Sequence, residues 1–168
     1  MSDILRKLDS SDIEKLVSMA NNPAIADDMS TLPSPFLEKH ALELIYRSKD
    51  NEDVVSGIMD KESKELAGVV MLRDFERAHE QAELSIWIGQ EYWGKGLGSA
   101  AIIAMSDIGF HEQNLNRIYA YTMVRNTASM RILEKSGFTR EGLLRERVII
   151  CGIYEDVYLY ARLKKDRL

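Results

Sequence analysis

The apolar positions at the start of the chain have a helical spacing after a short strand. Residues 4–8 are mostly apolar and suit a strand. Ser11 and Glu14 have the spacing of a capping box, which predicts that a helix begins there. Apolar residues then recur at i, i+3, i+4 and i+7, the spacing of one helix face: Ile13, Leu16, Val17 and Ala20. Asn22-Pro23 is expected to end this helix.

A second helix is predicted after the next proline. Ser34-Pro35 has the pattern of an N-cap followed by proline at the first helical position. One face of this helix would carry the apolar residues Leu37, Ala41, Leu44 and Ile45.

After Asp50 the pattern changes to that of strands. Residues 53–59, 65–73 and 81–88 read as three strands separated by short polar turns. In the third of them, apolar and more polar positions alternate, as expected for a strand with two different faces. One side carries Leu84, Ile86 and Ile88, and the other carries Glu83, Ser85 and Trp87.

The remaining pattern predicts a mixed sheet. A glycine-rich turn at 94–98 leads into a mostly apolar helix at 99–111, followed by a strand at 117–123. A short helix at 127–135 follows, with Gly137 placed as its C′ residue, and residues 138–149 and 154–163 form closing strands. This order predicts one α/β (α+β) domain over residues 1–168, with about seven strands and about four helices, and not a repeated βαβ design.

Composition and charge indicate the size of the domain and the kinds of molecule that it can bind. The chain has 168 residues, 45% of them hydrophobic and 29% charged, which suits one domain with a sizeable core. It lacks an apolar run long enough to span a membrane, and its N-terminus does not resemble a secretory signal, so we expect a cytoplasmic protein. The net charge of −5 argues against nucleic-acid binding and fits a basic substrate better.

Cysteine and histidine usage predicts neither a disulfide framework nor a metal site. The single cysteine, Cys151, excludes an intramolecular disulfide. The three histidines, His40, His79 and His111, are far apart and lack the spacing of metal ligands. No metal is therefore expected.

The glycine-rich turn is the segment that points most directly to a ligand. Gly94, Gly96 and Gly98 follow a strand and precede a helix. Glycines let the backbone approach a ligand closely, and a helix N-terminus presents unpaired N–H groups with partial positive charge. Lys95 adds a cation. The turn therefore predicts a phosphate site.

Three other interpretations of the turn fit less well. Residues 89–95 read Gly-x-x-x-x-Gly-Lys, but the Ser or Thr of a nucleotide P-loop is replaced by Gly96. Gly96, Gly98 and Ala101 fit a dinucleotide fingerprint, but the following strand does not end in the acidic residue that would bind a ribose. A plain tight turn would not need three glycines and a lysine at a helix start.

Two motifs resemble one known family. Residues 93–99, Trp-Gly-Lys-Gly-Leu-Gly-Ser, resemble the pyrophosphate loop of GNAT-superfamily acetyltransferases, Gln/Arg-x-x-Gly-x-Gly/Ala. Trp93 replaces the usual Gln or Arg, which is similar to the RimJ/RimL-like branch of ribosomal-protein N-terminal acetyltransferases. Residues 126–138 resemble that branch's Asn-x-x-Ser…Glu-Lys-x-Gly-Phe segment, and Glu141-Gly142 and Gly152-x-Tyr154-x-Asp156-Val157 look like its closing hairpin. The resemblance covers essentially the whole chain.

The resemblance implies a mostly antiparallel sheet that splays between its fourth and fifth strands, with acetyl-CoA in the V between them. Main-chain groups near Ile86, Trp87 and Ile88 would pair with the pantetheine amides, and the glycine turn would hold the pyrophosphate. The cofactor-binding residues expected by resemblance are Ile86, Trp87, Ile88, Trp93, Gly94, Lys95, Gly96, Leu97, Gly98, Ser99 and Asn126.

The resemblance also implies direct transfer of the acetyl group to an amine in a ternary complex. Glu83 is the expected base, because it looks like the strand glutamate of many of these enzymes. Ser129 is the expected acid at the leaving thiolate, because the position where the superfamily often carries a tyrosine is Leu133 here. Tyr121 and Tyr154 are weaker acid candidates. A backbone N–H near Ile88 would polarise the thioester carbonyl.

The acceptor is expected to be a protein or peptide N-terminal α-amine, such as that of a ribosomal protein. An α-amine has a pKa near 7.7–8.0, so deprotonating it at pH 7 costs about 1 kcal/mol, against about 4.6 kcal/mol for a lysine-like amine. A polyamine, an amino acid or an aminoglycoside remains an alternative acceptor, and so does a non-catalytic CoA-binding module. Either a monomer or a homodimer fits the sequence.

Overall fold

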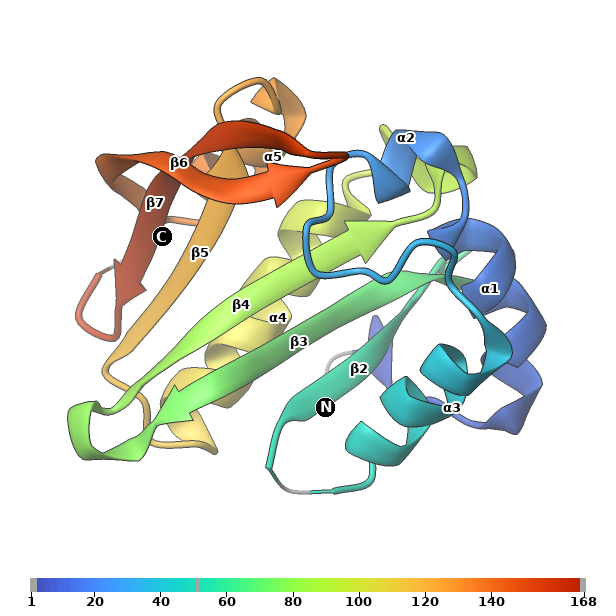
Figure 1. Cartoon of the computed structure of the whole chain (residues 1–168). Helices are drawn as coiled ribbons and strands as arrows, with labels where there is room; N and C mark the ends of the chain where they lie inside the picture. The colour runs from blue at the N-terminus through green and yellow to red at the C-terminus, as the bar shows by residue number, and fades with distance from the viewer. Residues whose placement is uncertain (1–2, 51, 167–168) are drawn as a thin grey trace.

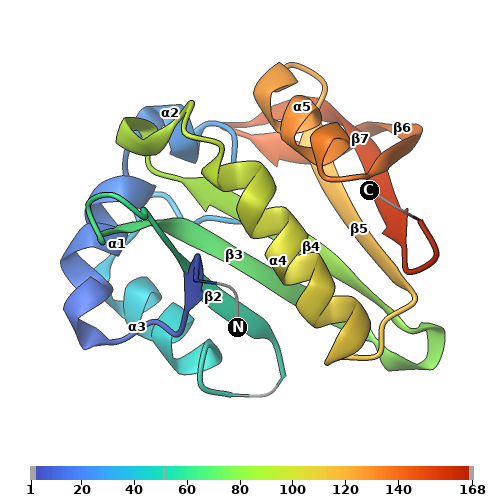
Figure 2. The same ribbon diagram turned by 180° about the vertical axis from the view of Figure 1, so that it is seen from behind.

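The computed structural model describes residues 3–50 and 52–166, which form one seven-stranded sheet with helices on both faces (Figures 1 and 2). The strands are β1 (Leu5–Arg6), β2 (Val54–Met59), β3 (Leu66–Glu76), β4 (Gln81–Ile88), β5 (Arg117–Met123), β6 (Thr139–Ile150) and β7 (Ile153–Leu163). The α-helices in the described part of the chain are α1 (Ile13–Ala20), α2 (Pro23–Ala26), α3 (Glu38–Arg47), α4 (Leu97–His111) and α5 (Thr127–Lys135). The mixed α/β fold expected from the sequence is confirmed.

The sheet separates into two arms between β4 and β5. The strand order is β1-β2-β3-β4-β5-β7-β6, and β4 and β5 form its parallel pair. Their pairing covers only the start of each strand, ending where Glu83 lies opposite Tyr119. Beyond that point β4 stays paired with β3 and β5 stays paired with β7, so the two strands diverge (Figure 1). The predicted splay between the fourth and fifth strands is confirmed.

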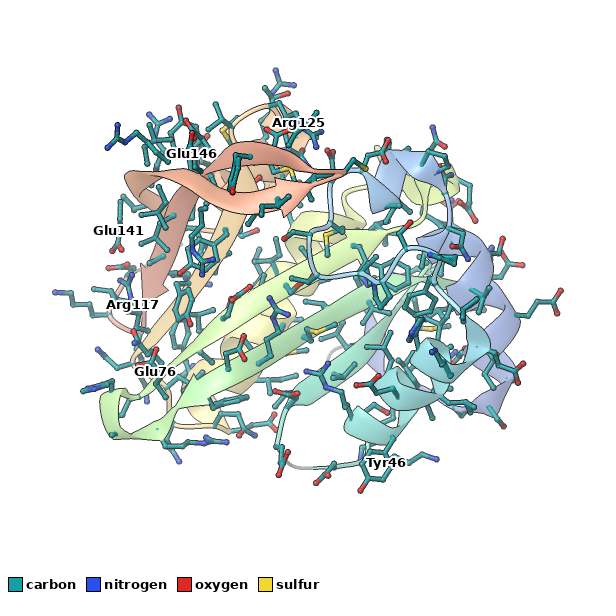
Figure 3. The ribbon with its side chains drawn as sticks, viewed as in Figure 1. Tyr46, Glu76, Arg117, Arg125, Glu141 and Glu146 are labelled. Carbon is teal, nitrogen blue, oxygen red and sulfur yellow. The ribbon has the colours of Figure 1, made fainter. Side chains whose placement is uncertain are left out.

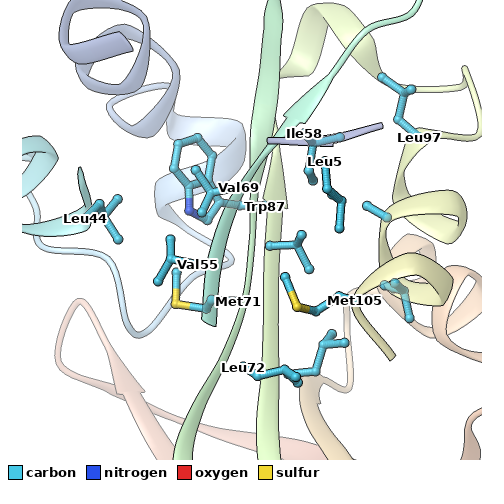
Figure 4. Packing of buried hydrophobic residues seen from close by; sticks show 14 of the residues in the cluster. Leu5, Leu44, Val55, Ile58, Val69, Met71, Leu72, Trp87, Leu97 and Met105 are labelled. Atoms are coloured by element: carbon cyan, nitrogen blue, oxygen red, sulfur yellow. The ribbon is translucent and has the colours of Figure 1, made fainter. Parts of the chain in front are cut away.

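The two faces of the sheet pack against different helices. α1 and α3 cover one face, and α4 and α5 cover the other (Figures 1 and 2). Because side chains alternate along a strand, Met71 and Trp87 lie on the side of α3, whereas Leu72 lies on the side of α4 with Met105 (Figure 4). α4 is apolar on most sides, and many of its residues are buried. Met105 among them is fully buried. The core therefore extends on both sides of β3 and β4.

Two predicted helix starts are wrong. α1 is preceded by a 3-10 turn, Ser10–Asp12, in which Asp9 Oδ1 accepts from the Ser11 N–H at 2.8 Å and Asp12 Oδ2 accepts from the Asp9 N–H at 2.9 Å. The capping box therefore joins Asp9 to Asp12 and not Ser11 to Glu14. The reason is that Asp12 is held in place by a second interaction, with Arg6 Nη2 at 2.6 Å.

The second wrong start is Ser34-Pro35, which forms a cis peptide bond in a loop and does not cap a helix. The backbone of Phe36 is held by Asn21, whose side chain bonds both its N–H and its C=O. This places the Phe36 side chain in the core. α3 begins only after this anchor, with His40 Nδ1 accepting from the Leu37 N–H at 2.9 Å.

The predicted end of α5 is confirmed, because it depends on a backbone conformation that glycine favours. Gly137 has φ +82° and follows α5, as predicted for a C′ glycine. Its N–H donates to the Glu134 carbonyl at 3.1 Å, and the Phe138 N–H donates to the Leu133 carbonyl at 3.1 Å. These two bonds form a Schellman motif, which ends α5 where the sequence predicts. Among the described residues, no helix is both long and apolar enough to cross a membrane.

Candidate active site

A cavity of about 490 Å³ lies between the diverging strands β4 and β5. Its walls come from these two strands, the glycine turn before α4, the start of α5, residues 24–31 and part of β6. Most of the residues predicted to bind a cofactor or to act in catalysis line it: Glu83, Ile86, Trp87, Ile88, Trp93, Gly94, Gly96, Leu97, Gly98, Asn126 and Ser129. Residues that are distant in sequence are thus gathered at the split of the sheet.

The glycine turn opens the N-terminus of α4 toward this cavity. Gly94 has φ +78° and Gly96 has φ +77°, a backbone region that favours glycine. A Cβ built at either position would meet nothing within 4 Å, so space remains beside the backbone for a ligand. Gly96 is the N-cap of α4 and supplies no side-chain cap, which leaves the first N–H groups of the helix for another acceptor. These features fit a diphosphate.

The Lys95 side chain anchors the turn from outside the cavity. Its Nζ lies 3.2 Å from Asp60 Oδ2 and 5.4 Å from the centre of the Tyr92 ring. The Tyr92 hydroxyl in turn donates to Glu65 at 2.7 Å. Hydrogen bonds from Ser63 and then Lys95 lower the pKa of the buried Asp60 carboxyl, which keeps this carboxyl ionised. The structure thus assigns the lysine charge to Asp60, whereas the sequence suggested a phosphate. Ser99 also lies outside the cavity lining.

Glu83 is the carboxylate nearest the point where the strands separate. Its side chain is 14% exposed, and its Oε1 accepts from Arg73 Nη2 at 2.7 Å. Tyr119 lies opposite it on β5. Burial, followed by the charge of Glu83, raises the pKa of Tyr119 to about 12, so this phenol stays protonated at neutral pH. Arg73 thus holds the Glu83 side chain in one position at the cavity wall.

The start of α5 places a hydroxyl at the opposite wall. Asn126 caps the helix, because its Oδ1 accepts from the Ser129 N–H at 2.9 Å. Both residues line the cavity, and so does the buried Leu133, which by resemblance stands where the superfamily often has a tyrosine. Tyr121 also lines the cavity, whereas Tyr154 is 62% exposed and does not.

A polar network that the sequence did not reveal ties the segment after α2 to the β5–β7 arm of the sheet. Arg125 bonds to Asp28, which is 97 positions away in sequence, and its Nε donates to Glu155 at 3.2 Å. Asn126 Nδ2 adds a bond to Asp28 Oδ2 at 3.0 Å. Figure 3 shows Arg125, which joins the segment after α2 to β7. No local pattern marks such pairs, since each residue alone resembles an ordinary surface charge.

The family follows from a match over most of the chain. The family model described as "Acetyltransferase (GNAT) domain" matches residues 4–139. The chain belongs to the GNAT acetyltransferase family. It is therefore an enzyme that transfers an acetyl group from acetyl-CoA to an amine. Among the described residues, no group of three His, Cys, Asp or Glu side chains is placed to hold a metal ion.

Individual relatives fall into more than one substrate class. The probable N-acetyltransferase YjcK of Bacillus subtilis is 36% identical over 142 residues, which cover 84% of this chain and 77% of that protein. A crystal structure of spermidine N-acetyltransferase from Vibrio cholerae with CoA and spermine has a TM-score of 0.84 at 30% identity, covering 96% of this chain and 95% of that one. A ribosomal-protein-S5-alanine acetyltransferase from Vibrio fischeri has a TM-score of 0.84 at 25% identity, with coverage of 96% and 93%.

In this acetyltransferase the indole of Trp93 lies at the end of β4. It is 51% exposed, and its Nε1 donates to the Ile88 carbonyl at 2.8 Å. That carbonyl belongs to the main-chain segment expected to pair with pantetheine. If pantetheine pairs with the Ile88 carbonyl, the bound cofactor would therefore compete with the Trp93 hydrogen bond to that carbonyl.

Replacing Gly96 with Ala is expected to weaken acetyl-CoA binding by about tenfold, or ~1.4 kcal/mol. The added Cβ would project into the space beside the helix N-terminus, and the positive φ would strain the turn. Calorimetry with acetyl-CoA measures the change.

Gly152→Ala is the matched control for this substitution. Gly152 has φ +80° and equally open surroundings, but it lies at the β6–β7 turn outside the cavity lining. The Gly152→Ala variant carries the same backbone cost as Gly96→Ala. Its affinity for acetyl-CoA is nevertheless expected to stay near wild type, because the turn lies outside the cavity. Equal affinities for the two variants would show that the space beside Gly96 does not receive the cofactor.

Proposed function

We propose that this acetyltransferase acts on the α-amine of a peptide or protein N-terminus. The observation that carries the proposal is the charge balance of the cavity wall. In the described part of the chain, the acidic side chains that line the larger cavity are Asp28 and Glu83, and each is paired with an arginine. Arg147 also lines this cavity, over the Tyr121 ring at 5.2 Å. The wall has no surplus negative charge.

This balance disfavours a polyamine as the acceptor. Each further cationic nitrogen of a polyamine loses hydration when it enters a cleft, and a carboxylate free of other cations is needed to compensate. Both carboxylates already have an arginine partner here. A peptide N-terminus brings a single amine, and its other polar groups are neutral amides that do not require such partners.

The same wall can supply the proton transfers. Acetyl-CoA supplies an acetyl thioester when it is bound. We propose that Glu83 accepts the proton that the attacking amine loses, directly or through one water. Only a modest base is needed for an α-amine, because its pKa near 7.7–8.0 leaves an appreciable neutral fraction at pH 7. The Ser129 hydroxyl, on the opposite wall, is proposed to supply a proton at the thiolate.

A matched panel of amines tests the acceptor. Its members are a short peptide with a free N-terminus, the same peptide with a blocked N-terminus and an internal lysine, and spermidine, each followed by release of free thiol from acetyl-CoA. We expect kcat/KM for the free peptide to exceed the other two by about tenfold or more, because neutral amine is more abundant there and the two carboxylates described at the larger cavity are paired with arginines.

Two outcomes of this panel would overturn the proposal. A higher kcat/KM for spermidine would identify the enzyme as a polyamine acetyltransferase. Binding of acetyl-CoA without turnover of any amine would favour a CoA-binding module that does not catalyse transfer.

A further inference from the structure

A second, smaller cavity adjoins the first on the α3 side of the sheet. Its volume is about 120 Å³, and it lies between β3, β4, α3 and the loop before α3. The two cavities share part of their lining: Met29, Thr31, Arg73, Ser85 and Trp87. A group bound in the smaller cavity would therefore lie next to one in the larger cavity.

The Trp87 indole presents an unused donor at this shared wall. Trp87 is only 3% exposed, and its Nε1 has no hydrogen-bond partner among the described residues. Figure 4 shows Trp87 on the side of the sheet that faces Leu44 of α3, and Leu44 also lines the smaller cavity. An indole nitrogen can only donate, and buried donors in native proteins are normally paired. This buried donor suits a ligand atom that accepts a hydrogen bond.

Arg73 presents a second donor of the same kind. Its Nη2 is committed to Glu83, but its Nε is buried and donates no hydrogen bond within the described chain. Nε also forms an ion pair with Asp74 Oδ2, but their distance of 3.6 Å is too long for a hydrogen bond. Ser85, 9% exposed, lies between Glu83 and Trp87 on the same face of β4. This stretch of wall thus offers donors that only an acceptor atom can satisfy.

We infer that the smaller cavity binds the oxygen-bearing first residue of the acceptor, with Trp87 Nε1–H and Arg73 Nε–H donating to its oxygens. This inference rests on the proposed function and identifies what would select an N-terminal peptide. A polyamine carries only amines and methylenes, and its ammonium groups would leave both donors unpaired. A carbonyl or hydroxyl oxygen beside the amine would satisfy them.

The size of the cavity agrees with a single residue. Its volume of about 120 Å³ is several times the ~30 Å³ that a water occupies in the liquid and well below the ~300 Å³ of a small drug site. The apolar part of the lining, Phe36, Leu44 and Met71, would pack against the carbon atoms of that residue. Trp87 and Arg73 would thus act as specificity residues at the acceptor end of the site.

Indole NMR tests the contact directly in the complete protein. The chain has two tryptophans, so the ¹⁵N-labelled protein gives two indole signals, and Trp87→Phe assigns them. With CoA present to prevent turnover, saturating free-N-terminus peptide is expected to move the Trp87 indole signal downfield, whereas spermidine leaves it in place. If the peptide does not move this signal, the proposed hydrogen bond does not form.

Kinetics of Trp87→Phe test whether the bond contributes to specificity. Phe keeps an aromatic ring in the wall but removes the N–H. We expect kcat/KM for the peptide to fall by about two- to tenfold more than kcat/KM for spermidine, because a typical net hydrogen bond is of this size. Tyr46→Phe is the control, since Tyr46 is 67% exposed on the outer side of α3 and lines neither cavity (Figure 3).

The outcomes separate this inference from the proposed function. If the wild type does not acetylate the peptide at all, the proposed function fails, and the inference fails with it. A second outcome is that the peptide is a good substrate but its kcat/KM is unchanged in Trp87→Phe, or falls by the same factor as kcat/KM for spermidine. The inference then fails and the proposed function is unaffected. The N–H would then be satisfied by water or would serve only packing.

Discussion

Glu83→Gln is expected to lower kcat by about 100-fold or more, the usual contribution of a general base. The amide keeps the shape of the side chain, and its oxygen can still accept from Arg73, so the wall of the cavity is preserved. What is lost is the ability to take up a proton from the attacking amine. Steady-state kinetics with a free-N-terminus peptide measures kcat, and the KM for acetyl-CoA is expected to change little.

Glu76→Gln is the matched control for this prediction. Glu76 is an exposed residue at the end of β3, where its Oε1 accepts from Gln81 at 2.9 Å, and it lines neither cavity (Figure 3). Its removal is expected to leave kcat unchanged. A Glu83→Gln enzyme with wild-type turnover would remove this carboxylate from the mechanism and assign its role to binding Arg73.

Gly68→Ala is expected to reduce the free energy of unfolding by about 2–3 kcal/mol, at the upper end of overpacking effects. Gly68 pairs with Ile88 across β3 and β4. A Cβ at this position would lie 2.3 Å from the Trp87 carbonyl oxygen and 2.9 Å from the Ile88 Cα. These are backbone atoms, so relief requires the two strands to move apart. Urea denaturation monitored by circular dichroism measures the loss.

Gly142→Ala separates this contact from a general effect of losing a strand glycine. Gly142 is in β6, and a Cβ there would meet nothing within 4 Å. Its expected change is within about 0.5 kcal/mol, as for most surface substitutions. If both variants are equally stable, β3 and β4 are more loosely paired at Gly68 than the structure indicates. A shift of Ile88 in Gly68→Ala would also weaken acetyl-CoA binding, because this residue lines the cavity.

The candidate site shows which parts of function follow from local sequence. The turn around Gly94 and Gly96 was predicted because only glycine adopts its backbone without strain and because a helix start follows at once. Glu83 was expected at the site because it resembles the strand glutamate of the family, and it lines the cavity. The contact of Lys95 with Asp60 was not predicted, because Asp60 comes from a distant turn.

The sequence by itself determined the order of the strands and of the longer helices, and the bounds of β4, β5 and α5, because periodicity and glycine geometry are local properties. Only the tertiary structure decided the remainder. The cap at Asp9, the Asp28–Arg125 link across 97 positions and the unpaired Trp87 N–H all depend on which side chains meet in space. Pairing and burial are set by packing between segments far apart in the chain, and no local pattern encodes them.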